Sequence, residues 1–188
     1  ANLGIPRGLD YNGAQQEGVG YFQRTILNGR RMSAARAFLK PARHRPNLTI
    51  VTHAQVSKIL FDGRRATAVR YRRGDQEHEV RANREILLAA GAIASPQILQ
   101  VSGVGPAGLL RDIGVAPVHP LSGVGENLSD HFGIRLSARL QGIKTINENT
   151  RGLALAVEAV KYGLFRKGIL AQSPGIALAL CKSRPALD

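Results

Sequence analysis

The stretch REILLAAGAIASPQILQVSGVG, residues 84–105, decides the fold of this chain. Its apolar run at residues 85–90 has the length of a strand that is buried on both faces, as in a parallel sheet. Gly91 removes the side chain where this strand would end, so another group can approach the backbone there. Ser95 then begins a helix as its N-cap, with Pro96 at the first helical position. Strand, glycine turn and helix together predict half of an α/β nucleotide-binding unit.

The sequence before this stretch predicts further strands and one helix. We expect strands at residues 21–27, 48–52, 56–61, 66–72 and 77–81. Ser33 begins a helix that Pro41 ends. Asp-Gly and Gly-Asp turns separate the last three strands, which is the pattern of a three-stranded antiparallel β-meander.

The sequence after it predicts a short helix at residues 109–113 and then a second domain. Apolar and polar side chains alternate over residues 132–140, as in a strand with one buried face. Residues 152–167 predict a helix with an apolar stripe, and residues 176–180 predict a last strand. Such a helix can lie on a membrane surface, but packing against a sheet is the interpretation that we prefer.

The chain is strongly basic, with a net charge of +13. Residues 18–61 contain no acid, while arginines accumulate between Arg24 and Arg45. One interpretation is a nucleic-acid-binding face. We prefer the other, in which the balancing acids lie on sequence outside this chain, because no nucleic-acid motif or aromatic platform accompanies the charge. We therefore expect no nucleic-acid partner.

Several classes of site and location are disfavoured. Cys181 is the single cysteine, which rules out an internal disulfide and suits a reducing compartment. The histidines show no metal-ligand spacing, so we expect no metal site. No apolar run reaches the ~18–20 residues that span a bilayer, and no leader sequence is visible. These features predict a cytoplasmic protein without a transmembrane segment.

Two further patterns are misleading. Residues 103–108 fit the dinucleotide motif G-x-G-x-x-G, but a predicted helix precedes them and Pro106 has no N–H to offer a phosphate. The pair Asp130-His131 suggests catalysis, yet adjacent residues on a strand point to opposite faces. We expect this pair to have a structural role.

Four blocks resemble the glucose–methanol–choline (GMC) flavin oxidoreductases and occur in that family's order. Residues 91–105 match its second signature at nine positions over fifteen residues. The sequence VGENLSDH at residues 124–131 resembles the next block, and residues 28–35 and 45–49 are similar to the preceding ones. The resemblance covers roughly residues 10–188 and is to the middle of such an enzyme. Residues 168–188 look most like the choline-dehydrogenase branch.

This resemblance implies a fold class and a division into domains. Residues 1–131 would be the later part of an FAD-binding, Rossmann-like α/β domain that contains the three-stranded β-meander. Residues 132–188 would begin an antiparallel-sheet substrate domain. The full-length enzyme would transfer hydride from a CH–OH donor, a small-molecule alcohol, to FAD, and it could associate with a membrane.

The resemblance also implies which residues meet the cofactor. Val56 stands where the family's backbone contacts the adenine of FAD, and Ala90 and Gly91 stand near its adenosine ribose. The catalytic histidine of the family would lie beyond Asp188, so we expect no catalytic residue in this chain. The Asn-Leu-x-Asp-His block at residues 127–131 would fix a loop over the flavin. The fragment itself is expected to lack FAD and to be inactive.

Two alternatives from other classes stay open: a basic nucleic-acid-binding module, and a non-catalytic binding or scaffolding domain. We also expect the isolated chain to associate with itself. The predicted strands at residues 48–52 and 85–90 would leave an apolar edge unpaired, and such edges recruit other chains.

Overall fold

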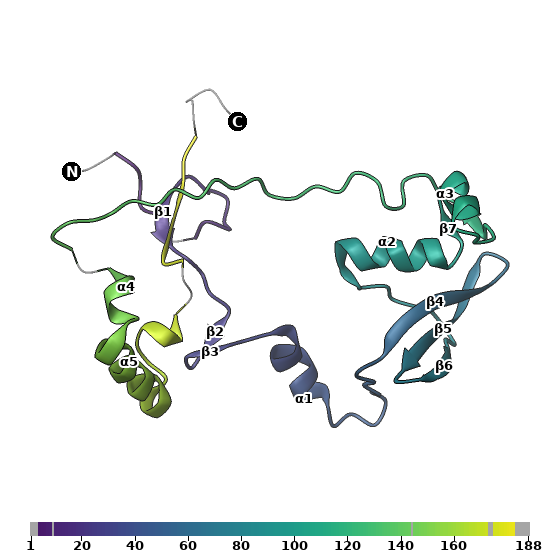
Figure 1. The fold of residues 1–188 in the computed structure, drawn as a ribbon, viewed down its shortest axis with the longest axis horizontal. Coiled ribbons are helices and arrows are strands. Elements are labelled where there is room, and N and C mark those ends of the chain that lie inside the picture. Colours follow the sequence, from purple (N-terminus) through teal and green to yellow (C-terminus); the bar gives the residue numbers. More distant parts are fainter. Residues whose placement is uncertain (1–3, 9, 144, 173–174, 183–188) are drawn as a thin grey trace. The chain divides into compact units, whose positions relative to one another are not determined.

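The computed structural model describes residues 4–8, 10–143, 145–172 and 175–182, which form two compact units. Unit 1 comprises Ala1–Leu48 and Ser137–Asp188, and unit 2 comprises Thr49–Leu136. Figure 1 labels the elements of both units along the chain. The expected division between residues 131 and 132 into cofactor and substrate domains stays a prediction.

Unit 2 contains a three-stranded antiparallel sheet. Its strands are β4 (Gln55–Asp62), β5 (Arg65–Arg73) and β6 (Gln76–Arg81), in that order. Gly63 and Gly74 lie in its two turns at φ +55° and +60°, where glycine carries no steric cost. The Rossmann-like framework that we expected around this sheet is not seen in the described residues and stays a prediction.

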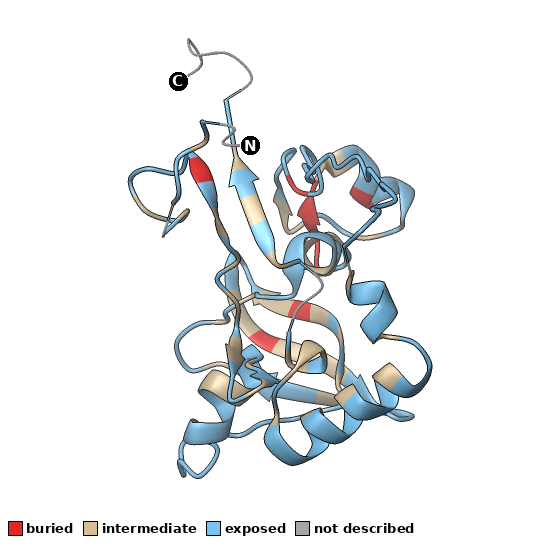
Figure 2. Ribbon diagram, turned by 90° about the vertical axis from the view of Figure 1, so that its left-hand side faces the viewer, coloured by how far each residue is buried: buried red, intermediate tan, exposed pale blue. Residues whose placement is uncertain are grey.

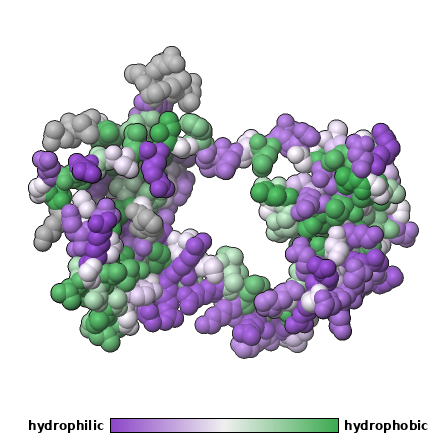
Figure 3. Space-filling model, viewed as in Figure 1, coloured by the Kyte–Doolittle hydropathy of each residue, from purple (hydrophilic) through white to green (hydrophobic). Residues whose placement is uncertain are grey.

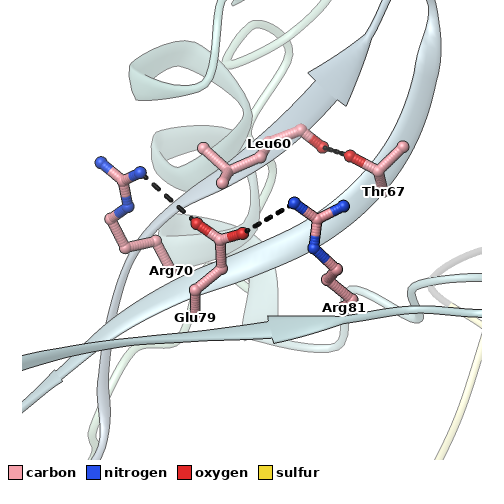
Figure 4. Close-up of polar contacts among 5 residues, drawn as sticks. All are labelled: Leu60, Thr67, Arg70, Glu79 and Arg81. Carbon is pink, nitrogen blue, oxygen red and sulfur yellow. Dashed lines mark hydrogen bonds and ion pairs between the residues drawn. The ribbon is translucent and has the colours of Figure 1, made fainter.

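Polar contacts between neighbouring strands support the sheet (Figure 4). The Thr67 hydroxyl donates to the carbonyl of Leu60 at 3.3 Å. The carboxylate of Glu79 on β6 lies 3.5 Å from the Arg70 guanidinium of β5, across the strands, and 3.8 Å from the guanidinium of Arg81, two residues along its own strand. Cross-strand ion pairs of this exposed kind contribute little to stability, so apolar packing carries the sheet.

The helix α2 (Gly91–Val101) begins earlier than the sequence predicts. Ala90 is its N-cap and Pro96 lies inside it, so the prediction of Ser95 as N-cap is wrong. Ser95 serves the helix start in another way, because its hydroxyl accepts a hydrogen bond from the Ala90 N–H at 3.1 Å.

The remaining elements of unit 2 enclose its small core. The strands β7 (Val104–Gly105) and β8 (His119–Pro120) pair in parallel, and α3 (Ala107–Asp112) connects them. The Leu110 side chain of α3 is fully buried. The other buried hydrophobic residues of the described chain also belong to unit 2: Ile59, Ala68, Val104 and Val124.

Three predicted strands are wrong. Residues 48–52, 85–90 and 132–140 have no strand structure. A β-strand exists through hydrogen bonds to a neighbouring strand, and no described residue pairs with these segments. Their apolar side chains are correspondingly open to solvent, as at Leu87 (83% exposed) and Phe132 (92% exposed).

Unit 1 is held together by short pairings. The strand β1 (Gly18–Tyr21) pairs antiparallel with β9 (Ala177–Leu180), and β2 (Ile26–Leu27) forms a hairpin with β3 (Arg30–Arg31). The predicted strand at residues 21–27 is therefore split in two. The hairpin turn has positive φ at both Asn28 and Gly29, which is the geometry of a two-residue turn between twisted strands.

The helices of unit 1 follow. A π-helical segment η1 (Ala35–Leu39) runs into α1 (Lys40–Ala42), so Pro41 does not end the helix as predicted. Nearer the C-terminus lie α4 (Ile146–Asn149), α5 (Gly152–Phe165) and the 3₁₀ turn η2 (Ile169–Ala171). No helix in the described part of the chain is long and apolar enough to cross a membrane.

Much apolar surface is exposed in both units. Figure 2 shows few buried residues, and Figure 3 shows apolar side chains open on the visible face. The stripe of α5 is an example, with Leu153, Val157, Val160 and Leu164 each at least 60% exposed. Apolar surface of this extent is typical of an interaction surface. Self-association of the isolated chain stays a prediction. The exposed apolar side chains give a physical reason for it, because contact between two chains would remove them from water.

Glu158 on α5 organises the segment that follows the helix. Its carboxylate accepts a hydrogen bond from the Ile169 N–H at 2.8 Å and another from the Lys161 ammonium at 3.1 Å. The Ile169 N–H, and after it Lys161, lower the pKa of the Glu158 carboxyl below its ordinary value. Gly168 has φ +90°, and a Cβ there would collide with the same carboxylate.

We predict that Glu158→Gln loosens η2 at neutral pH. The folded-state pKa is lowered, so the ionised carboxylate stabilises the fold above its ordinary pKa, and this contribution is lost as the pH falls through the folded value. Hydrogen exchange of the Ile169 amide should be faster in the variant near pH 7, with the difference from wild type closing in acid. The control is Glu17→Gln, since no described residue bonds to the Glu17 side chain. A difference that persists unchanged at a pH below the lowered folded-state pKa of Glu158 would contradict this account.

Candidate functional site

Two of the blocks singled out in the sequence line one groove of unit 2. The groove has a volume of ≈ 510 Å³. One wall is a face of α2, and the other is the loop that follows Val124. The lining residues are Ala92, Ile93, Pro96, Gln97 and Gln100 from the helix, and Gly125, Glu126, Asn127, Leu128 and Ser129 from the loop. Twenty-four residues of chain separate Gln100 from Gly125, and the fold brings the two walls together.

Gln100 joins the two walls. Its side-chain amide donates a hydrogen bond to the carbonyl of Val124 at 3.1 Å. A Cβ at Gly125 would lie 2.6 Å from Gln100 Nε2, and one at Gly105 would lie 3.1 Å from Gln100 Cγ. The two glycines therefore leave the space through which the Gln100 side chain reaches the loop.

Ser102 fixes the end of α2 against β4. Its hydroxyl accepts a hydrogen bond from the Ile59 N–H at 2.8 Å and donates one to the Ile98 carbonyl at 2.5 Å. Ser102 is 6% exposed, so both bonds lie away from water, where an unpaired partner would be costly. The groove wall is thus anchored to the sheet.

The predicted cofactor residues Ala90 and Gly91 lie at the other end of α2, and both are exposed. Gly91 adopts φ +88°, and no atom lies within 4 Å of where its Cβ would be. The backbone there is open to an approaching group. The groove begins with the next residue, Ala92, whose carbonyl lacks its usual helical donor because residue 96 is proline.

Val56, the third predicted cofactor residue, lies near the start of β4. It is half-buried and pairs with Tyr71 of β5. The strand β4 is at the edge of its sheet, so part of its backbone has no strand partner within unit 2. The helix α2 packs against β4, which places the three predicted residues on or beside two contacting elements.

The pair Asp130-His131 does not form a catalytic arrangement here. The Asp130 carboxylate accepts a hydrogen bond from the backbone N–H of His131 at 2.7 Å, and no described residue links it to the imidazole. No group of His, Cys, Asp and Glu suited to a metal occurs among the described residues.

Comparison with known families identifies the class of this protein. A family model described as GMC oxidoreductase matches residues 1–133. The match covers more than half of the chain, and it includes both walls of the groove. The chain belongs to the GMC oxidoreductase family.

Two curated relatives of this chain share one name. The chain is 60% identical over 136 residues to an oxygen-dependent choline dehydrogenase from Ectopseudomonas mendocina, and 57% identical over 134 residues to one from Stenotrophomonas maltophilia. Each match covers 71% of this chain and 24% of the relative. The matched part therefore spans about a quarter of the length of these relatives.

Solved structures of related enzymes have the same fold. An FAD-dependent oxidoreductase from Chaetomium thermophilum is 31% identical with a TM-score of 0.73, covering 85% of this chain and 29% of its own. A fungal aryl-alcohol oxidase is 25% identical with a TM-score of 0.80, covering 94% and 31%. A formate oxidase, 22% identical with a TM-score of 0.84, supports the fold alone.

Sequence reasoning missed Gln100. The signature at residues 91–105 leaves position 100 unspecified, and a polar residue in a helix is unremarkable by itself. The signal that points to it is the pair of glycines at positions 105 and 125, which only the fold places beside one side chain.

We predict that Gly125→Ala destabilises unit 2, while Gly123→Ala does not. Gly125 has φ +89° and its Cβ would displace the Gln100 amide, whereas no atom lies within 4 Å of a Cβ at Gly123. The left-handed backbone alone costs ~1–2 kcal/mol for a residue with a Cβ. Denaturant unfolding of the two variants measures the difference, and equal midpoints would show that the loop does not depend on this close approach.

Proposed function

We propose that the complete enzyme is an FAD-dependent oxidoreductase that oxidises a CH–OH donor, with choline as the substrate. The observation that carries the proposal is the 60% identity to a protein named oxygen-dependent choline dehydrogenase over 136 residues. The groove supports it, since the segment that matches the family includes both of its walls.

The residues of this chain fit an adenine nucleotide at the start of α2 and β4. Gly91 offers open backbone in a conformation suited to glycine, and the edge strand β4 offers backbone groups near Val56 that can pair with the edge of a base. A β-branched valine also suits contact with a flat ring. We assign Val56, Ala90 and Gly91 to this cofactor contact.

Bound FAD would supply the acceptor for a hydride from the alcohol carbon. The role of this chain is then to hold the cofactor and to shape one wall of the space beside it. We place the catalytic base on sequence outside residues 1–188, and we assign the groove loop, residues 124–129, to a position over the flavin. We further propose that the substrate is a small molecule and that the enzyme has no nucleic-acid partner. We place the enzyme in the cytoplasm, and the alternative is that the complete enzyme associates with a membrane.

The function is tested by mixing the purified complete enzyme with choline in the absence of oxygen. We expect the oxidised flavin absorbance to bleach as the cofactor takes up hydride. If the flavin absorbance of an FAD-containing enzyme does not bleach with choline but does bleach with another alcohol, the proposed class stands and choline is refuted as the substrate. An enzyme that binds no FAD would refute the class.

The cofactor contact is tested by Val56→Asp in the complete enzyme. A carboxylate there loses apolar contact and places a charge beside the cofactor, which costs ~1–3 kcal/mol or roughly 5- to 160-fold in affinity. Val80→Asp on β6 is the matched control, since Val80 lies in the same sheet and is 54% exposed. The flavin-to-protein ratio after gel filtration is the measurement, and equal ratios would remove Val56 from the site.

A further inference from the structure

The Gln100 side chain holds the two walls of the groove together through a single hydrogen bond. Its amide reaches the Val124 carbonyl at 3.1 Å, and Val124 is 8% exposed. The loop residues that follow, at positions 125–130, are all exposed. Among the described contacts, this hydrogen bond ties the buried start of the loop, Val124, to α2. The position of Val124 therefore influences where the exposed residues that follow it lie.

The surroundings of Gln100 are shaped for this contact. Gly125 and Gly105 lie where any larger residue would press on the Gln100 side chain, at 2.6 Å from Nε2 and 3.1 Å from Cγ. Gln97 lies one turn earlier on α2 and lines the same groove, yet no described group bonds to its side chain. Two glutamines of one helix face thus differ in whether they bind the loop.

We propose that Gln100 is a positioning residue that sets the distance between the loop at residues 124–129 and the face of α2. In this role it fixes how the loop lies over the flavin, and this part rests on the proposed function. Gln100 acts through the backbone of Val124 and takes no part in the chemistry.

The test uses the complete enzyme with three variants. Gln100→Leu keeps the approximate size and removes the donor, Gln97→Leu is the control on the same helix face, and Gln100→Glu turns the donor into an acceptor when ionised. Hydrogen exchange, corrected for the intrinsic pH dependence of the amides, reports protection of the loop at the Val124 and Glu126 amides, which donate to the carbonyls of Leu121 and Gly123. Flavin circular dichroism and FAD content report the cofactor.

We expect Gln100→Leu to lower protection of the loop by roughly 3- to 10-fold, the worth of one net hydrogen bond, and Gln97→Leu to leave it unchanged. In Gln100→Glu the carboxylate faces a carbonyl, so protection should be low near pH 7 and should recover as the acid form, which can donate, appears at lower pH. A role in packing alone would not give this pH-dependent recovery.

Each outcome decides a separate claim. Equal loop protection in Gln100→Leu and Gln97→Leu overturns the proposal, and so does a Gln100→Glu protein without pH dependence. If Gln100→Leu does not fold, the pH dependence of loop protection in Gln100→Glu decides whether Gln100 positions the loop. Loop protection that falls while the flavin dichroism and FAD content stay at wild-type values overturns the link to the cofactor. A wild-type enzyme without FAD refutes the proposed function, and the exchange measurement still decides the role of Gln100.

Discussion

The candidate site depends on the two hydrogen bonds that the Ser102 hydroxyl makes. The hydroxyl donates to the Ile98 carbonyl within the last turn of α2 and accepts from the Ile59 amide of β4. One small group thereby ends the helix and fastens it to the edge of the sheet. Because Ser102 is 6% exposed, loss of the hydroxyl would leave the buried Ile59 N–H without this partner, whereas the Ile98 carbonyl would keep its hydrogen bond from the Ser102 backbone N–H at 3.2 Å. The position of α2, and with it one wall of the groove, follows from this contact.

The groove illustrates how glycine and a polar side chain work as a pair. Gly105 and Gly125 are far apart in the chain, but both face Gln100. Side chains at these two positions would press on Gln100, so the absence of a Cβ at both leaves room for its amide to reach Val124. The proposed cofactor residues at the start of α2 adjoin the same groove, so the two ends of one helix serve binding and positioning.

The two units differ in what stabilises them. Unit 2 holds the buried hydrophobic residues of the described chain, whereas unit 1 relies on β1–β9, on the β2–β3 hairpin and on Glu158. Helices such as α5 can form locally, because their hydrogen bonds lie within one segment. Residues 85–90 cannot form a strand in the same way, since a strand needs partners from elsewhere. Their apolar character is evident from the sequence, while their conformation depends on what lies beside them.

The family, the turns at Gly63 and Gly74, and helices near residues 91–101 and 152–165 could be predicted from the residues alone, because these depend on local backbone preference and on short motifs. The tertiary structure alone decided that residues 92–100 and 125–129 share a groove and that Gln100 bridges it. It also decided that the helix starts at Gly91 rather than at Ser95, whose hydroxyl bonds back to Ala90. The physical reason is that contacts between distant segments depend on the path of the whole chain, which no local pattern encodes.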